Sequence, residues 1–118
     1  MKLRFHSATL RLRLSRSEVA LLRESGRVEE QITFAGGHGL SYAIELRPAP
    51  EMAASFDGGR IEVAVPEELG RRWIDGNEAG IENPGATPKI LIEKDFQCVH
   101  GDAAEQADAF PNPLMDKF

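Results

Sequence analysis

A run of alternating apolar and polar residues followed by a short amphipathic stretch occurs twice in the chain. The first copy alternates leucine with arginine over residues 10–14 and continues into an amphipathic stretch over residues 15–26. The second copy alternates over residues 61–65 and continues over residues 66–76. Period-two alternation is typical of a strand, and apolar residues three or four positions apart are typical of a helix. The pattern therefore predicts two related halves, each built as strand, short helix and strand.

Each amphipathic stretch carries signals for where a helix starts and stops. Ser15 with Glu18 fits a capping box, in which the hydroxyl and the carboxylate each accept a bond from a free amide at the helix start. Pro66 suits the first position of a helix, because the amide that proline lacks would have no partner there. Gly26 and Gly76 are natural helix ends. Both helices are short, so they need packing against the rest of the fold to persist.

Alternation elsewhere in the chain predicts the remaining strands of a mainly β (α+β) fold. About eight strands and two short helices are expected. The strands are predicted over residues 2–6, 9–14, 28–34, 40–46, 54–56, 61–65, 78–82 and 89–96. Leu3 and Phe5 are expected to point into the core, as are Trp73 and Ile74 of the second helix. A small barrel closed by the two halves is one arrangement that such a repeat allows.

The character of the sequence changes near residue 100. Residues 1–100 are expected to form one globular domain. Residues 101–118 are rich in small and acidic residues and lose the apolar periodicity, so they are expected to form a flexible acidic C-terminal tail. Phe110, which lies beside prolines in this tail, either docks on the domain or serves as a short linear motif.

The overall composition narrows the class of protein. The chain has 118 residues, of which 42% are hydrophobic and 28% charged, as in ordinary globular domains. No stretch approaches the roughly 20 apolar residues of a membrane span, and arginines interrupt any run near the start that would resemble a signal peptide. Cys98 is the single cysteine, so no disulfide can form within the chain. These features predict a cytoplasmic protein that does not bind membranes.

Charge is distributed unevenly along the chain. The net charge is −5, yet residues 1–28 hold seven basic residues against two acidic ones. The first predicted hairpin places Arg4, Arg11 and Arg13 beside Lys2 on its outer face. This face is a candidate site for an anionic or protein partner, and the alternative is a solvated strand surface. The overall acidity argues against indiscriminate nucleic-acid binding, since such affinity depends on neutralising phosphates.

Cys98 and His100 lie two positions apart near Asp95, and these residue types bind metal ions. A closed zinc site needs four ligands and a catalytic one needs three with a water, so further ligands would have to come from elsewhere in the fold. The alternative is an inert, partly buried cysteine beside a surface histidine. No catalytic triad order, phosphate-binding loop or dinucleotide motif is present, so no cofactor is expected and a binding protein is favoured over an enzyme.

The second copy of the repeat resembles a known DNA-binding fold. Residues 59–69, followed by Gly76 and residues 79–82, look like the core of an AbrB/MazE-type swapped-hairpin domain. The resemblance implies a dimer that contacts DNA through arginines near the strand–helix junction. The candidate arginines of this chain are Arg60, Arg71 and Arg72. The neighbouring residues are largely acidic, which departs from that pattern.

A second resemblance covers nearly the whole chain. Residues 10–19, the sequence EKDFQC at residues 93–98 and the sequence FPNP at residues 110–113 look like a family of small bacterial proteins of unknown function. This resemblance implies a stand-alone cytoplasmic domain with the EKDFxC and FPNP elements as hallmarks. It implies nothing about chemistry.

Three functional hypotheses follow. The oligomeric state is open in the first and the third, and the second implies a dimer. The first is a small non-catalytic binding or regulatory module with a protein partner, in which the acidic tail competes for the basic face of Arg4, Arg11 and Arg13. The second is a dimeric swapped-hairpin regulator whose DNA binding depends strongly on salt. The third is a metal-dependent enzyme built around Cys98 and His100, which predicts stoichiometric metal in the purified protein.

Overall fold

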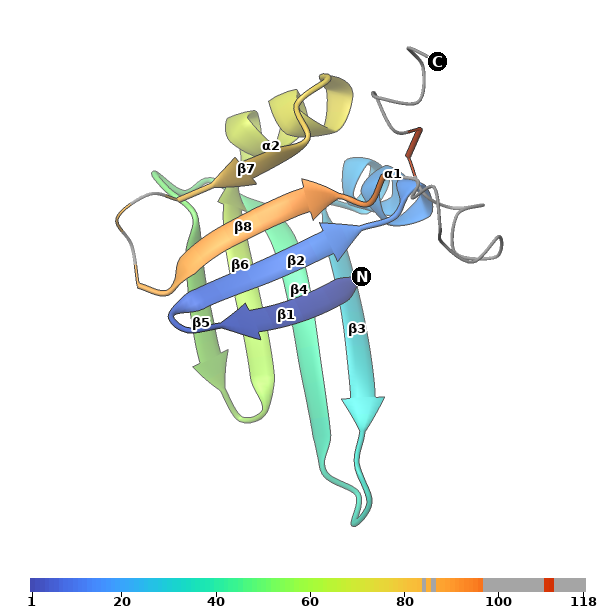
Figure 1. Cartoon of the computed structure of the whole chain (residues 1–118), viewed down its shortest axis with the longest axis vertical. Coiled ribbons are helices and arrows are strands. Elements are labelled where there is room, and N and C mark those ends of the chain that lie inside the picture. The colour runs from blue at the N-terminus through green and yellow to red at the C-terminus, as the bar shows by residue number, and fades with distance from the viewer. Residues whose placement is uncertain (84, 86, 97–109, 112–118) are drawn as a thin grey trace.

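A computed structural model describes residues 1–83, 85, 87–96, 110 and 111, and within them it has eight strands and two helices (Figure 1). The strands are β1 (Lys2–His6), β2 (Thr9–Leu14), β3 (Arg27–Thr33), β4 (Gly39–Arg47), β5 (Ala53–Asp57), β6 (Arg60–Pro66), β7 (Gly80–Glu82) and β8 (Lys89–Lys94). The helices are α1 (Arg16–Ser25) and α2 (Glu67–Asp75). The predicted α+β class is confirmed.

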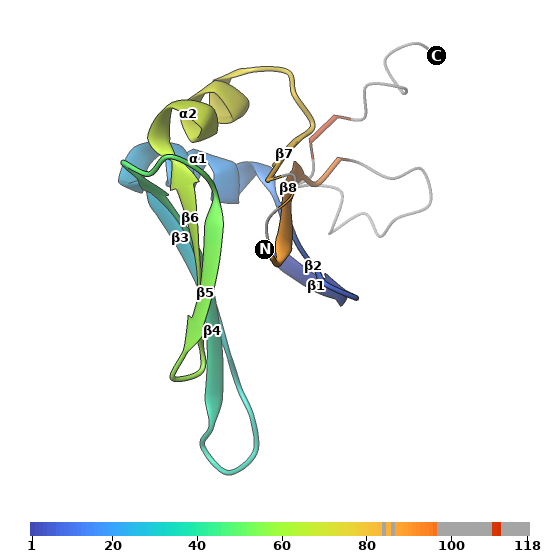
Figure 2. The same ribbon diagram turned by 90° about the vertical axis from the view of Figure 1, so that its left-hand side faces the viewer.

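The strands form two four-stranded sheets that lie face to face. Sheet A has the order β1-β2-β8-β7, and sheet B has the order β3-β4-β6-β5. The central pair of each sheet is parallel and the outer pairs are antiparallel. Figure 1 shows the strands of sheet A crossing in front of those of sheet B. Figure 2 shows that the sheets lie close together beside the helices and diverge at the opposite end, so the molecule is a wedge that opens away from the helices.

The two halves of the chain exchange strands. The series β1, β2, α1, β3, β4 of the first half corresponds in order to the series β5, β6, α2, β7, β8 of the second. Sheet A joins β1 and β2 to β8 and β7, and sheet B joins β5 and β6 to β4 and β3. The predicted pair of related halves is therefore confirmed. Each sheet takes two strands from each half, because each helix carries the chain from one sheet to the other.

The predicted barrel is wrong. β1 and β7 end sheet A, β3 and β5 end sheet B, and no ladder joins the edges of the two sheets within the described residues. Closure requires the last strand of a sheet to pair with the first. Here each helix sends the following strand to the opposite sheet, so the chain forms two open sheets.

The helix signals read from the sequence are largely confirmed. The Ser15 hydroxyl accepts a bond from the Glu18 amide, the Glu18 carboxylate accepts one from the Ser15 amide, and Gly26 ends α1 with a φ of 75°. Pro66 precedes the first helical residue of α2 instead of occupying it. Trp73 is buried as predicted. Within the described residues, neither helix is long and apolar enough to cross a membrane.

The core fills the closed part of the wedge with the inward residues of both sheets and one side of each helix. Its fully buried members are Leu12, Leu14, Leu22, Ile44, Val63, Val65, Trp73, Ile90 and Ile92. The expectation that Phe5 is buried with them is wrong. Phe5 lies on the inner face of sheet A, but its side chain is 63% exposed because the sheets have diverged at that end.

The two halves differ in strand length, which breaks the symmetry of the wedge. β3 and β4 have seven and nine residues, whereas their counterparts β7 and β8 have three and six. The β3–β4 hairpin therefore extends beyond β1, as Figure 1 shows. Ile32 near the end of β3 and Phe34 in the following loop are about half exposed. The part of this hairpin that extends beyond β1 thus carries exposed apolar residues.

A candidate binding groove between the two sheets

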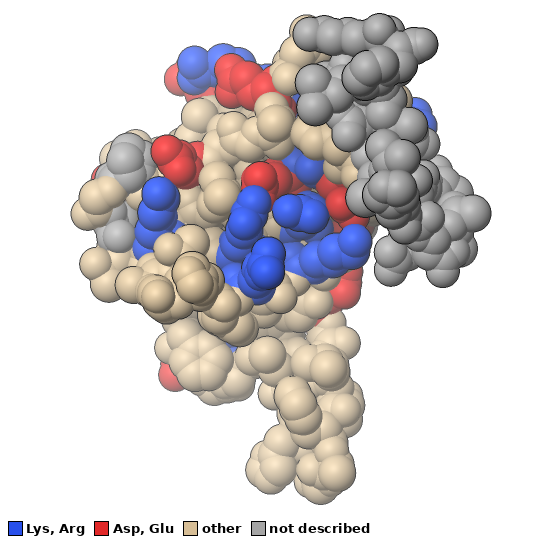
Figure 3. All heavy atoms as spheres, in the orientation of Figure 1, with Lys and Arg blue, Asp and Glu red and all other residues tan. Residues whose placement is uncertain are grey.

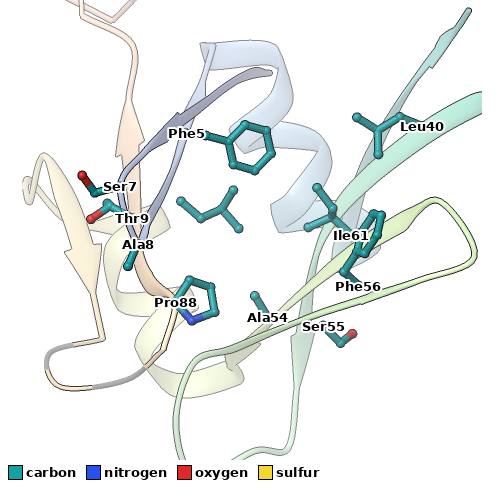
Figure 4. Close-up of a pocket in the computed structure, with 11 residues that line it drawn as sticks. Phe5, Ser7, Ala8, Thr9, Leu40, Ala54, Ser55, Phe56, Ile61 and Pro88 are labelled. Atoms are coloured by element: carbon teal, nitrogen blue, oxygen red, sulfur yellow. The ribbon is translucent and has the colours of Figure 1, made fainter.

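An open apolar groove lies where the two sheets diverge (Figure 4). Its volume is about 620 Å³. It is lined by Phe5, Ser7, Ala8, Thr9, Leu10, Leu40, Ala54, Ser55, Phe56, Ile61 and Pro88. Figure 4 shows Phe5 projecting from sheet A toward Ile61 and Leu40 of sheet B, with Phe56 on the same side as Ile61. The groove is therefore built from the inner faces of both sheets.

The strand registers show that the main lining residues are equivalent positions of the two halves. Phe5 is paired with Leu10 across the β1–β2 ladder, and Phe56 is paired with Ile61 across the β5–β6 ladder. The exposed fractions of Phe5 and Phe56 are 63% and 68%. The groove therefore lies where the two related hairpins face each other, at the end of the wedge opposite the helices.

The described lining of this groove is apolar with a few hydroxyl groups. Among the described lining residues, Ser7, Thr9 and Ser55 carry hydroxyl groups, and none carries an acid, an amine or an imidazole. General acid–base or nucleophilic catalysis needs a titratable or activated group within reach of the reacting atoms. An apolar cleft of this size with a few polar groups at its rim is typical of a ligand-binding site.

The basic face predicted from the sequence forms on the outer side of sheet A (Figure 3). The β1–β2 register places Lys2 opposite Arg13 and Arg4 opposite Arg11. Figure 3 shows the lysine and arginine side chains gathered at the centre of this face. The structure thus brings the three predicted arginines together.

Two of these four cations have carboxylate partners and two have none among the described residues. Arg11 Nε lies 2.5 Å from Glu93 Oε1, and this bond raises the pKa of the arginine. Lys2 Nζ lies 3.0 Å from Asp95 Oδ2. Arg4 and Arg13 form no ion pair within the described part of the chain. They are therefore the two cations of this face that no described carboxylate neutralises.

Phe110 docks on the domain, as one of the two sequence alternatives proposed. Its amide donates to the Asp95 carbonyl over 2.7 Å, and its ring meets the Phe96 ring edge-on with centroids 6.0 Å apart. It also lies beside α1, where it lines a shallow hollow with Val19 and Ile74. Apart from Phe110 and Pro111, the predicted tail lies outside the described residues.

Lys94 lies buried between Phe110 and the core. Its side chain is 7% exposed, and Nζ lies 5.6 Å from the ring centroids of both Trp73 and Phe110. Nζ donates to the Gly76 carbonyl over 2.9 Å. Burial lowers the pKa of Lys94, the Glu78 carboxylate opposes this shift, and Arg23 adds to it. The lysine thus joins β8 to the end of α2 at a cost in desolvation.

This burial predicts how stability depends on pH. Because the pKa of Lys94 is lower in the folded protein than its usual 10.5, the unfolded chain binds more protons between the two values. The free energy of unfolding of the wild-type protein should therefore rise relative to that of Lys94→Met as pH increases from neutral toward 10.5. Urea unfolding of both proteins across this range measures the difference. A difference that stays constant or reverses would contradict the burial argument.

The structure describes only one of the three candidate metal ligands. Cys98 and His100 lie outside the described residues, and the metal hypothesis stays a prediction. The third candidate, Asp95, pairs with Lys2. Among the described residues, no group of three or more histidine, cysteine, aspartate or glutamate side chains is placed to hold a metal ion.

The sequence predicts the basic face but not the groove. Alternation predicts that Phe5 belongs to the core, and for Phe56 it predicts only a place in a strand. The repeat contains a signal for the groove. In each half, a phenylalanine stands two positions before the two-residue turn of the hairpin.

Comparison with known proteins identifies a family but no activity. No curated protein and no solved structure matches the chain. A match at the level of protein families covers residues 1–114, which include all the strands, both helices and every residue of the groove. The chain belongs to the Family of unknown function (DUF7009).

Proposed function

We propose that the protein is a small, non-catalytic cytoplasmic binding module that takes apolar groups of its ligand into the groove between the sheets. The observation that carries this proposal is the pair of exposed phenylalanines, Phe5 and Phe56, that face a common apolar groove. Scattered apolar residues on a surface are ordinary, whereas a contiguous apolar cleft indicates an interaction site.

Burying these rings would supply binding energy. Covering an exposed phenylalanine side chain is worth roughly 1.5–3 kcal/mol. Leu40 and Ile61 extend the apolar surface behind the two rings. A ligand that covers both rings would therefore gain enough to offset part of the entropy lost on association.

An uncharged solvatochromic dye such as Nile red tests the groove without involving the arginines. Phe56→Ser should weaken dye binding at least about fivefold, which corresponds to about 1 kcal/mol. The melting temperature should change little, because Phe56 is 68% exposed on an edge strand. The matched control is Phe34→Ser, which removes a similarly exposed ring outside the groove and should leave dye affinity unchanged. Equal affinity of the wild-type protein and Phe56→Ser would contradict the proposal.

A further inference from the structure

We propose that the free edge of β1 binds an extended segment of another protein in which apolar and acidic residues alternate. The segment would add a fifth strand to sheet A, place its apolar side chains in the groove and place its acidic side chains beside the arginines. This inference rests on the proposed function, because the apolar side chains of the segment would occupy the same groove.

The backbone of β1 is available on one side. β1 ends sheet A, and among the described strands it pairs only with β2. The two-residue turn at Ser7–Ala8 makes His6 and Thr9 a hydrogen-bonded pair, and such pairs recur at every second residue along the ladder. The amides and carbonyls of Leu3 and Phe5 therefore point away from β2. An edge strand with unpaired groups of this kind is a template for strand addition.

The inner side of an added strand would meet apolar surface. Beyond β1 the β3–β4 hairpin of sheet B continues (Figure 1), and it carries the half-exposed Ile32 paired with Leu40, which lines the groove. Phe5 lies on the same inner side at the edge itself. Side chains two positions apart on a new strand would point toward this surface. The extended β3–β4 hairpin thus provides apolar surface that the inner side chains of an added strand would contact.

The outer side of an added strand would lie next to Arg4. Arg4 and Arg13 lack carboxylate partners among the described residues, and each lies opposite another cation on the neighbouring strand. Like charges placed directly opposite one another destabilise a sheet. Carboxylates on the adjacent new strand would relieve this repulsion, which is why the segment is expected to be acidic on that side.

The fold itself does not require this basic face. The corresponding outer positions of the β5–β6 hairpin are Ser55 and Asp57 on β5 and Arg60 and Glu62 on β6, so the same architecture forms there with a single cation. The β5 edge therefore lacks the charge that would select an acidic segment. A second copy of this chain pairing β1 with β1 is disfavoured, because Lys2 and Arg4 of each copy would be brought against those of the other.

The test uses a fluorescent peptide that alternates valine with glutamate and a companion that alternates valine with lysine, measured by fluorescence anisotropy on the full chain. The acidic peptide should bind, its affinity should fall as salt is raised, and the lysine peptide should bind at least about tenfold more weakly. Hydrogen exchange should show slower exchange of the β1 amides when the acidic peptide is bound. The melting temperature of each variant establishes that it is folded.

Two charge-reversal variants separate this inference from the proposed function. Arg4→Glu should weaken the acidic peptide about tenfold and leave Nile red binding unchanged. The control Arg16→Glu reverses an exposed arginine on α1, away from the edge, and should change neither. Unchanged peptide affinity in Arg4→Glu, or equal binding of the two peptides, would overturn the edge proposal while dye binding still supports the groove. A dimer that Phe56→Ser dissociates would assign the groove to a second copy instead and also overturn the edge proposal.

Discussion

Leu12→Ala is expected to lower the free energy of unfolding by about 3–4 kcal/mol, a large share of the stability of a domain this size. Leu12 has no exposed surface and lies on β2 between Leu3 of β1 and Ile92 of β8. Replacing its isobutyl side chain with a methyl group loses the transfer energy of the three buried carbons removed and leaves a cavity that the two packed sheets cannot fill by collapsing. Urea unfolding followed by tryptophan fluorescence measures the change, because Trp73 belongs to the same core.

The matched control is Leu21→Ala. This variant makes the same substitution at a residue of α1 that is 48% exposed. Alanine also has a slightly higher helix propensity than leucine. This variant should change stability by less than about 0.5 kcal/mol. Similar losses in both variants would mean that the space between the sheets is not packed as described.

Asn83→Ala is expected to cost about 2–3 kcal/mol through two lost hydrogen bonds. Asn83 is buried just after β7, and its side chain joins the two sheets. Its Oδ1 accepts a bond from the Ile90 amide of β8, and its Nδ2 donates to the Met52 carbonyl over 3.4 Å just before β5. Alanine would leave a buried amide and a buried carbonyl without partners, and each unpaired group pays its own desolvation penalty. The change is measured by urea unfolding.

Asn77→Ala serves as the control, because Asn77 is exposed after α2. It should be nearly neutral for stability. The two variants can also be compared by hydrogen exchange, where Asn83→Ala should speed exchange at Ile90 because that amide loses its acceptor. If the Ile90 amide exchanges equally slowly in Asn83→Ala, the hydrogen bond to the Asn83 side chain is not what protects that amide.

Much of the local structure could be predicted from the sequence because its causes are local. Alternation gave the strands, and the serine–glutamate spacing at Ser15 gave the start of α1 with its capping box. The arginines of the first hairpin could be placed on one face because alternate strand residues share a side. The repeat predicted two related halves, and the corresponding order of strands in the two sheets confirms them.

The tertiary structure decided how those halves combine. Nothing in a local pattern says that β8 pairs beside β2 or β6 beside β4, because parallel pairing joins residues far apart in the chain. Among the described strands, the same exchange leaves four edges that pair with no further strand, so the barrel that the repeat allowed does not close.

The groove is also a product of the tertiary structure. Alternation places Phe5 on the inner face of its strand, and this is all that the sequence determines. Whether an inward residue is buried depends on how far the facing sheet extends and on where the two sheets diverge. Here the closed end of the wedge buries Leu12, while the open end leaves Phe5 and Phe56 exposed to form a site. Side-chain direction is set by the local backbone, but burial is set by the opposing sheet, which the local sequence pattern does not describe.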